Sequence, residues 1–252
     1  MIPIRDQLPT RSFPFINYLI IVANVLVFVW YGVVLPGAGA GDITDEYGFI
    51  PYNFSHAPIE AAPTILTSMF MHGSLAHLGG NMLALWIFGD NVEDAVGHIR
   101  YVAFYLLGGI VAALTQMITD TSSHIPMVGA SGAIAAVMAG YLVLYPTSPI
   151  TVLNPFLPLW FFFGLFFELP AWVVAIYFFG INLYSGWLAH EGPHQGMGGV
   201  AFFAHIGGFI AGLLLVHLFM SGRPRRQAEK WSGWRPPPRR RTNDWSGPPY
   251  YR

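Results

Sequence analysis

Residues 127–140 read MVGASGAIAAVMAG, a run of small and apolar residues in which Ser131 is flanked by Gly129 and Gly132. The run carries no charge and is typical of a membrane-spanning helix. A hydroxyl at the start of such a helix is unusual, because polar groups in lipid are costly and tend to be functional. Ser131 is therefore the first candidate for a reactive residue, and polar groups at the same depth in other spans are its candidate partners.

The composition of the whole chain also indicates a membrane protein. Of its 252 residues, 54% are apolar and only 10% are charged, whereas about a quarter of a soluble domain is charged. Cysteine is absent, which excludes disulfides, thiolate nucleophiles and cysteine metal sites.

Apolar runs of about 20 residues, the length that crosses the hydrocarbon core, recur along the chain. We expect an all-α membrane protein, a bundle of six transmembrane helices over residues 15–35, 68–89, 100–119, 128–145, 171–189 and 199–220. Residues 36–63 are acidic, contain no Lys or Arg, and include the aromatic stretch GFIPYNF. They predict a structured external loop after the first span.

The stretch between the fourth and fifth spans, residues 146–169, is aromatic and apolar but interrupted by prolines. Its longest clean apolar core, residues 159–167, is too short to cross a bilayer. We expect a re-entrant or interfacial segment here, and the alternative is a seventh span.

The distribution of positive charge decides between six and seven crossings. Arg5 and Arg11 precede the first span, nine Lys or Arg residues follow the last, and none occurs in residues 101–222. Positive charge marks the cytoplasmic side, so both termini are expected there, which requires an even number of crossings. Residues 1–14 are then a cytoplasmic N-terminus, 15–220 a six-span domain, and 221–252 a cytoplasmic tail.

The tail is basic and rich in proline, which predicts disorder. Its expected partner is anionic lipid at the membrane surface, and a proline-rich ligand motif is the alternative.

In this topology the second, fourth and sixth spans run from outside to inside, so polar residues near their starts lie at similar depth. These residues are His72, His77, Asn81, Ser131 and His205. His77 and Asn81 are four apart and share a helix face, whereas His72, read as part of the same helix, points elsewhere.

Small residues recur every four positions in the fourth span (Gly132, Ala136) and in the sixth (Gly208, Gly212). Such stripes allow two helices to approach closely in lipid. If these spans pack through the stripes, His205 comes within reach of the Ser131 hydroxyl, which needs a base to act as a nucleophile. No acidic residue lies near enough in any span to complete a triad, so the sequence predicts a Ser–His dyad.

A helix that begins at Ser131 also offers free backbone N–H groups to a carbonyl oxygen. His77 and Asn81 could donate from the neighbouring helix. Together these donors predict an oxyanion hole, the usual requirement for acyl transfer.

The motifs HGSLAHLGGN (72–81), GASG (129–132) and AHIGG (204–208), each near the outer end of its span, resemble those of the rhomboid family of intramembrane serine proteases. The resemblance covers residues 15–220. It implies Ser131 as nucleophile, His205 as general base, and an oxyanion hole from the Ser131 N–H, His77 and Asn81.

The resemblance further implies that His72, Gly129, Ala130 and Gly132 adjoin the site. The substrates are then transmembrane proteins cleaved near the outer membrane face, without metal or cofactor. The expected location is a bacterial plasma membrane, crossed several times. Inactive relatives often place a proline before the serine, and Ala130 stands there instead.

Two positions depart from the family pattern. Many relatives carry an aromatic residue one turn after the serine, under the histidine, and here that residue is Ala135. The Trp-Arg pair often found in the first loop is missing from residues 36–63.

Three other functions compete with a serine endopeptidase. A non-catalytic relative would bind transmembrane helices and need no reactive serine. Residues 190–194, HEGPH, match the H-E-x-x-H zinc signature, but Gly192 and Pro193 disfavour the helix that the signature requires. A transporter is disfavoured because no span carries a buried acidic residue for ion coupling.

Overall fold

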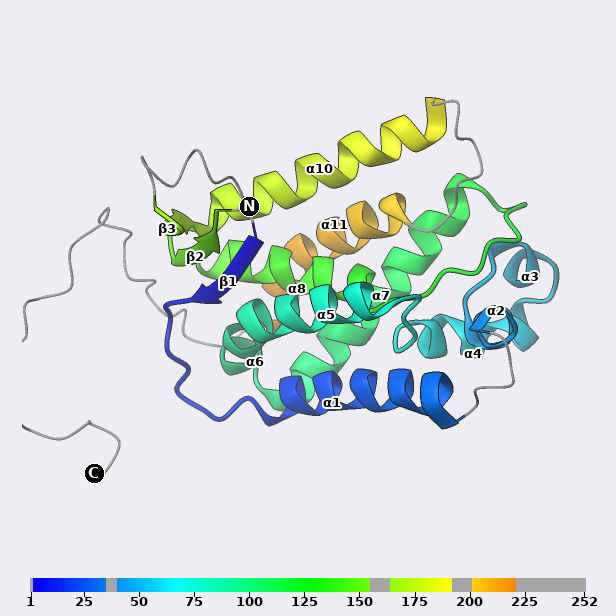
Figure 1. The fold of residues 1–252 in the computed structure, drawn as a ribbon, viewed down its shortest axis with the longest axis horizontal. Coiled ribbons are helices and arrows are strands. Elements are labelled where there is room, and N and C mark those ends of the chain that lie inside the picture. The colour runs from blue at the N-terminus through cyan, green and yellow to red at the C-terminus, as the bar shows by residue number, and fades with distance from the viewer. Residues whose placement is uncertain (1, 35–39, 155–163, 192–200, 221–252) are drawn as a thin grey trace, which may run out of the picture.

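The structure is a computed structural model that describes residues 2–34, 40–154, 164–191 and 201–220 (Figure 1). The described chain is mostly helical, with one small sheet. The elements are β1 (Ile2–Asp6), α1 (Phe15–Val29), the π-helical turn η1 (Trp30–Val34), α2 (Ala40–Tyr47), α3 (Pro51–His56), α4 (Pro58–Ser68), α5 (Leu75–Ala84), the π-helical turn η2 (Leu85–Gly89), α6 (Asp90–Val96), α7 (His98–Thr119), α8 (Ser131–Leu144), β2 (Pro149–Leu153), β3 (Phe166–Pro170), α10 (Ala171–Glu191) and α11 (Phe202–Phe219).

Among the described residues, three helical stretches are long and apolar enough to cross a membrane: Phe15–Gly32, His98–Thr119 and Phe202–Phe219. The fourth expected span is a shorter helix, because α8 begins only at Ser131. The second expected span is interrupted, since α5 begins at Leu75 rather than near residue 68.

Helices α7, α8 and α11 pack against one another through small residues. A Cβ added to Gly208 of α11 would lie 2.1 Å from the backbone oxygen of Gly132, and one added to Gly212 would lie 2.2 Å from the backbone oxygen of Ala136. A Cβ on Gly132 would meet the Cβ of Ala112 in α7 at 2.5 Å. The backbones therefore approach as closely as the glycine stripes predict.

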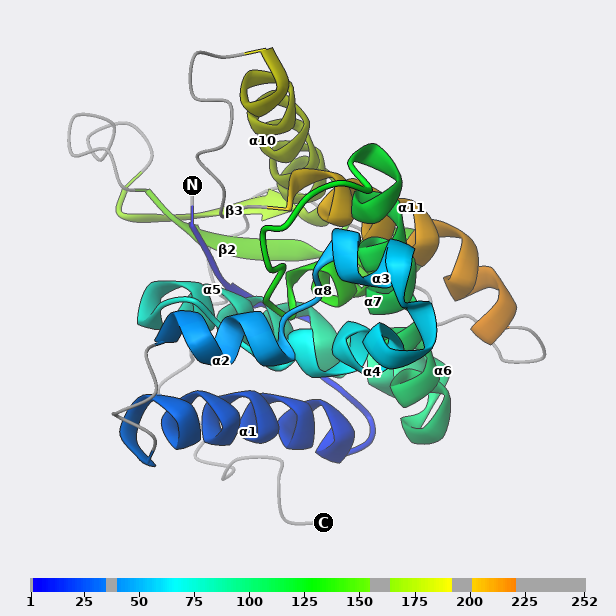
Figure 2. The same cartoon turned by 90° about the vertical axis from the view of Figure 1, so that its right-hand side faces the viewer.

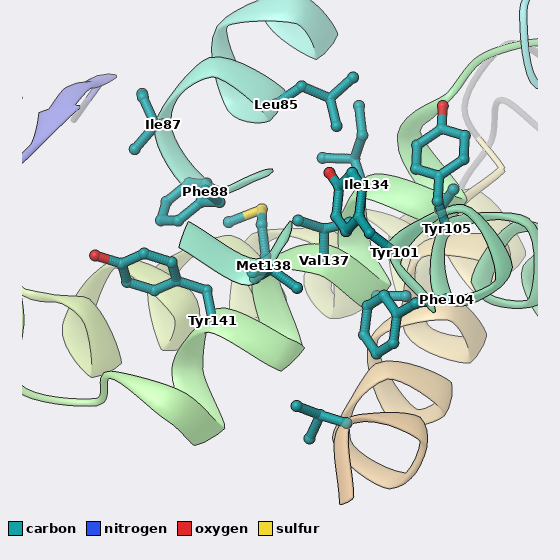
Figure 3. Packing of buried hydrophobic residues seen from close by; sticks show 14 of the residues in the cluster. Leu85, Ile87, Phe88, Tyr101, Phe104, Tyr105, Ile134, Val137, Met138 and Tyr141 are labelled. Atoms are coloured by element: carbon teal, nitrogen blue, oxygen red, sulfur yellow. The ribbon is translucent and has the colours of Figure 1, made fainter. Parts of the chain in front are cut away.

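The other side of α8 packs into the main apolar core (Figure 3). Tyr101, Phe104 and Tyr105 reach this core from α7, and Leu85, Ile87 and Phe88 reach it from η2; α8 contributes Ile134, Val137, Met138 and Tyr141. Large side chains on one face and small ones on the other hold α8 between its neighbours. The packing of α8 against α7, η2 and α11 therefore fixes the position of its first residue, Ser131.

The small sheet corrects the expectation of an all-α fold. Strands β1, β2 and β3 form an antiparallel sheet in that order, with Ile2 opposite Leu153 and Leu153 opposite Phe166. Both described ends of the segment expected to be re-entrant or interfacial are thus strands, and residues 155–163 between them lie outside the described residues. The N-terminal residues, which we expected only to be a polar cytoplasmic end, form strand β1 of this sheet.

The sheet and helices α2, α3 and α4 lie at opposite ends of the bundle (Figures 1 and 2). The stretch expected to be a structured first loop contains α2, α3 and the start of α4, with residues 48–50 between α2 and α3 outside any helix. Phe49 pairs through its backbone with Met127, which ties this region to the chain just before Ser131.

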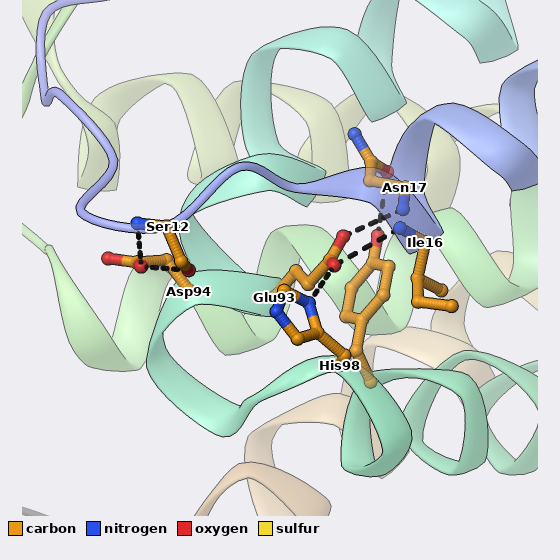
Figure 4. Close-up of polar contacts among 7 residues, drawn as sticks. Ser12, Ile16, Asn17, Glu93, Asp94 and His98 are labelled. Atoms are coloured by element: carbon orange, nitrogen blue, oxygen red, sulfur yellow. Dashed lines mark hydrogen bonds and ion pairs between the residues drawn. The ribbon is translucent and has the colours of Figure 1, made fainter.

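The start of α1 is anchored by acidic residues of α6 (Figure 4). The buried Glu93 carboxylate accepts the backbone N–H of Ile16 at 3.1 Å and of Asn17 at 2.7 Å, and it contacts His98. Asp94 accepts the Ser12 hydroxyl at 2.6 Å. A carboxylate at a helix N-terminus satisfies free N–H groups and interacts favourably with the positive end of the helix dipole.

Candidate active site

The Ser131 hydroxyl and the His205 ring lie within hydrogen-bond distance, with 2.7 Å between Oγ and Nε2. Ser131 is the first residue of α8, and His205 lies in the first turn of α11. The close approach of these helices at Gly132 and Gly208 brings the two side chains together. The structure therefore joins the two residues that the sequence analysis pairs.

Gly129 shapes the loop that presents the serine. Its φ is +127°, in the region that favours glycine, and an added Cβ would lie 2.7 Å from His77 Nε2 and 3.6 Å from Ser131 Oγ. The absence of a side chain at Gly129 thus leaves room for the His77 ring beside the serine. Ala130, which precedes Ser131, is fully buried.

His77 and Asn81 lie on α5, one turn apart, as the sequence predicts. The Ser74 side chain caps this helix by accepting the His77 N–H at 3.1 Å. Asn81 is buried, with 7% of its surface exposed. Ser74 was not singled out from the sequence, although a serine three residues before His77 is an N-cap signal.

The orientation expected for His72 is wrong. His72 precedes the helix, because Ser74 is extended and caps α5. The chain turns back there, so the His72 ring contacts Asn81, with 2.8 Å between Nε2 and Nδ2. The prediction assumed a continuous helix from residue 68, in which residues nine apart point in different directions.

Two polar contacts outside the predicted set position the elements that carry Ser131 and His205. The Ser68 carbonyl accepts the Gly129 N–H at 2.9 Å. The side chain of Gln116, near the end of α7, accepts the Ala204 N–H at 3.1 Å, next to His205. Neither contact has a local sequence signal, because each joins segments far apart in the chain.

The aromatic ring near His205 comes from α10. Phe178 lies with its ring centroid 6.1 Å from that of His205. Ala135, the position at which the resemblance leads us to expect an aromatic residue, is fully buried in an apolar cluster to which Phe178 also packs. This contact was not predicted, since nothing in the sequence of α10 distinguishes Phe178 from its aromatic neighbours.

The described residues contain no group of three or more His, Asp or Glu side chains that could hold a metal ion. The zinc-like motif at residues 190–194 is not tested by this finding, because residues 192–194 lie outside the described residues and the side chains of His190 and Glu191 are not described.

The arrangement suits acyl transfer. A hydroxyl paired with an imidazole can act as a nucleophile, since the ring accepts the proton as the new bond forms. The first N–H groups of α8 have no partner within the helix and can face a developing oxyanion. His77 lies beside the same loop, and Asn81 lies one turn further along α5.

Comparison with known proteins gives a consistent family. A model of the Rhomboid domain matches residues 61–222. The mitochondrial presenilin-associated rhomboid-like protein of Homo sapiens is 31% identical over 147 residues, which are 57% of this chain and 36% of that protein. Rhomboid-related protein 2 of Mus musculus is 28% identical over 210 residues, 82% of this chain and 65% of that protein. RHOMBOID-like protein 5 of Arabidopsis thaliana is 27% identical over 151 residues, 60% of this chain and 42% of that protein. The chain thus spans between 36% and 65% of the length of these relatives.

Proposed function

The chain belongs to the rhomboid family, and from that membership we propose that it is an intramembrane serine endopeptidase. The observation that carries the proposal is the 2.7 Å contact between Ser131 Oγ and His205 Nε2, two half-buried residues in the first turns of α8 and α11. A serine and a histidine at facing helix starts are costly in lipid and suggest a reactive pair.

In the proposed reaction, Ser131 Oγ attacks the carbonyl carbon of the scissile peptide bond while His205 Nε2 takes the hydroxyl proton. The tetrahedral intermediate collapses as His205 gives that proton to the leaving amine, which leaves an acyl ester on Ser131. His205 then deprotonates a water molecule that attacks the ester, and the serine leaves with its proton restored. This sequence uses two residues in place of a triad.

The oxyanion of both intermediates would be stabilised by the Ser131 N–H together with His77 and Asn81. Support comes from the helix start at Ser131 and from the His77 ring beside Gly129. Preorganised donors of this kind typically contribute a factor of about 10²–10³ each to turnover.

As a rhomboid, the protein is a multi-pass integral membrane protein. We keep six crossings with both termini on the cytoplasmic side, because the positive charge lies at the two ends of the chain. The expectation of a bacterial plasma membrane rests on the sequence resemblance alone, and the three relatives named above are eukaryotic.

The proposed substrates are transmembrane segments, cleaved near the outer membrane face. Helix α10 lies beside α11 at one side of the bundle (Figure 1), where a substrate helix would enter from the bilayer. The basic tail would contact anionic lipid on the cytoplasmic side.

The test incubates purified full-length protein, in detergent and in liposomes, with a model transmembrane substrate. Ser131→Ala removes only a hydroxyl and should abolish cleavage while leaving the melting temperature unchanged. Ser122→Ala, in an exposed loop, is the matched control and should cleave at the normal rate. A chelator should leave cleavage unchanged.

A fluorophosphonate probe separates the peptidase from a non-catalytic binder of transmembrane helices. We expect an adduct at Ser131 in the folded protein and none in Ser131→Ala. Cleavage that survives Ser131→Ala, or cleavage lost to a chelator, would refute the assignment. A folded protein with neither cleavage nor adduct would favour the binder.

A further inference from the structure

The hydroxyl of Tyr31 forms hydrogen bonds with the backbone of His72. Tyr31 lies at the end of the first apolar helix, and the His72 ring contacts Asn81. Tyr31 Oη accepts the His72 N–H at 2.9 Å and donates to the His72 carbonyl. Both residues are buried, with 7% of Tyr31 and 1% of His72 exposed. A side chain that satisfies both backbone groups of one residue fixes the position of that residue.

His72 in turn holds the Asn81 amide. An amide nitrogen can only donate, so at 2.8 Å the His72 Nε2 is the acceptor of this hydrogen bond. The amide has two hydrogens. One is bound to His72, which leaves the second N–H of Asn81 for the oxyanion.

The surroundings of Tyr31 make its position well defined. Tyr31 lies in the π-helical turn η1 and packs with Ile43 and Met71 in a cluster that also touches Val128, next to Gly129. A π-helical turn contains an additional residue relative to an α-helix, so the side chains after it point in a new direction, and such turns are frequent at functional sites.

From these contacts we infer that Tyr31 is a positioning residue of the oxyanion hole, acting on Asn81 through the backbone and ring of His72. The inference rests on the proposed function and adds a residue to it. Tyr31 does not touch the substrate. Its hydroxyl keeps the His72 ring where it can accept from Asn81, and the amide is thereby held in place before the substrate arrives. Preorganisation of this kind affects turnover more than substrate binding.

The experiment measures kcat and KM for a model transmembrane substrate with full-length protein. Tyr31→Phe removes the hydroxyl and keeps the ring, and should lower kcat about tenfold while KM stays within about twofold. Tyr101→Phe is the matched control, because its buried hydroxyl bonds to Asn17 at 2.9 Å, away from His72. It should change kcat by less than about twofold.

A double-mutant cycle tests the route through Asn81. If Tyr31 acts by orienting this amide, Tyr31→Phe should change kcat by less than about twofold once Asn81→Ala has removed the amide. If the losses of kcat caused by Tyr31→Phe and by Asn81→Ala multiply fully in the double variant, the inference is overturned. An unchanged kcat in Tyr31→Phe alone would also overturn it. A purely structural role would lower the melting temperature and would multiply.

Should Tyr31→Phe not fold, His72→Ala provides the same test one step nearer the amide. Its effect should likewise vanish in the Asn81→Ala background, and full multiplication would again overturn the inference. The outcome is separable from that of the proposed function. Absence of Ser131-dependent cleavage in the unmodified chain would refute the proposed peptidase activity. A cleavage rate that is the same in Tyr31→Phe as in the unmodified chain would refute only the positioning role of Tyr31.

Discussion

Phe178 occupies the neighbourhood of His205 that Ala135 leaves without an aromatic side chain. Both pack to the same apolar cluster, and the Phe178 ring is tilted by 41° to the imidazole. A ring near the base limits its rotation and excludes water from one face. The aromatic contact thus comes from α10, a different helix from the one that the family pattern leads one to expect.

Phe178→Ala should therefore lower kcat about tenfold, because His205 would sample orientations that no longer face Ser131 Oγ. Cleavage assays in detergent check this, with Phe179→Ala as the control. Phe179 lies on Phe209, with 5.0 Å between ring centroids, one turn beyond His205. Equal losses in the two variants would mean that α10 acts only as packing.

Single residues also mark where sequence reasoning succeeds and where it stops. The approach of Ser131 to His205 could be anticipated because it depends on small residues with a regular period, a pattern visible in one sequence. The contact of His72 with Asn81 could not, because it depends on where α5 begins. Ser74 sets that start by capping the helix, a signal that a continuous apolar run obscures.

At the scale of elements, the interface between α8 and α11 determines whether the proposed dyad forms. Gly208→Ala would place a Cβ 2.1 Å from the Gly132 backbone oxygen, a group that cannot rotate away. The helices would separate, so we expect cleavage to fall at least about a hundredfold, with a loss of about 1–3 kcal/mol in the free energy of unfolding.

Gly180→Ala in α10 is the matched control, since its added Cβ meets nothing within 4 Å. It should leave stability unchanged or slightly raised, because alanine favours helix. Cleavage assays and thermal melts on both variants make the comparison. Normal cleavage by Gly208→Ala would show that the Ser131–His205 contact does not require this close approach.

The carboxylate of Glu93 anchors the start of α1. Glu93→Gln replaces the carboxylate that accepts two N–H groups at the helix start, and it places an amide N–H among donors. We expect a loss of about 1–3 kcal/mol in the free energy of unfolding, measured by thermal or denaturant unfolding in detergent. Glu60→Gln, at an exposed position in the first turn of α4, should cost less than about 1 kcal/mol. Equal effects would contradict a specific anchor.

For the whole molecule, the sheet is the feature that sequence analysis could not supply. Ile2 pairs with Leu153, and no local pattern connects residues so far apart in the chain. Each strand has five residues, and prolines begin β2 and end β3, so periodicity alone gives a weak signal. By contrast, the long apolar helices could be predicted because each is a local property of the chain.

The sheet is attached to the helices through a half-buried acidic pair, Asp6 and Asp90. Asp6, at the end of β1, accepts the Asn91 amide at 2.7 Å and the Tyr141 hydroxyl at 3.0 Å. Burial raises the pKa of Asp6 to about 6, although hydrogen bonds and Arg5 oppose the shift. Burial and the charge of Asp6 raise the pKa of Asp90 to about 7. Both carboxyls therefore hold their protons more tightly in the folded state than in the unfolded chain.

This pair predicts how stability depends on pH. A carboxyl with a raised pKa contributes stability that is fully present below its unfolded pKa of 3.8 and is lost as the pH rises through the folded values of about 6 and 7. The melting temperature in detergent should therefore fall between about pH 4 and pH 7 and level off above. Asp6→Asn cannot ionise, so it should flatten this slope and raise stability at pH 8 by about 2 kcal/mol. Asp45→Asn, at an exposed position in α2, is the control and should keep the slope of the unmodified chain. A melting temperature that rises across this range in the unmodified protein, or an unchanged slope in Asp6→Asn, would show that the acidic pair is ionised without penalty when β1 is docked.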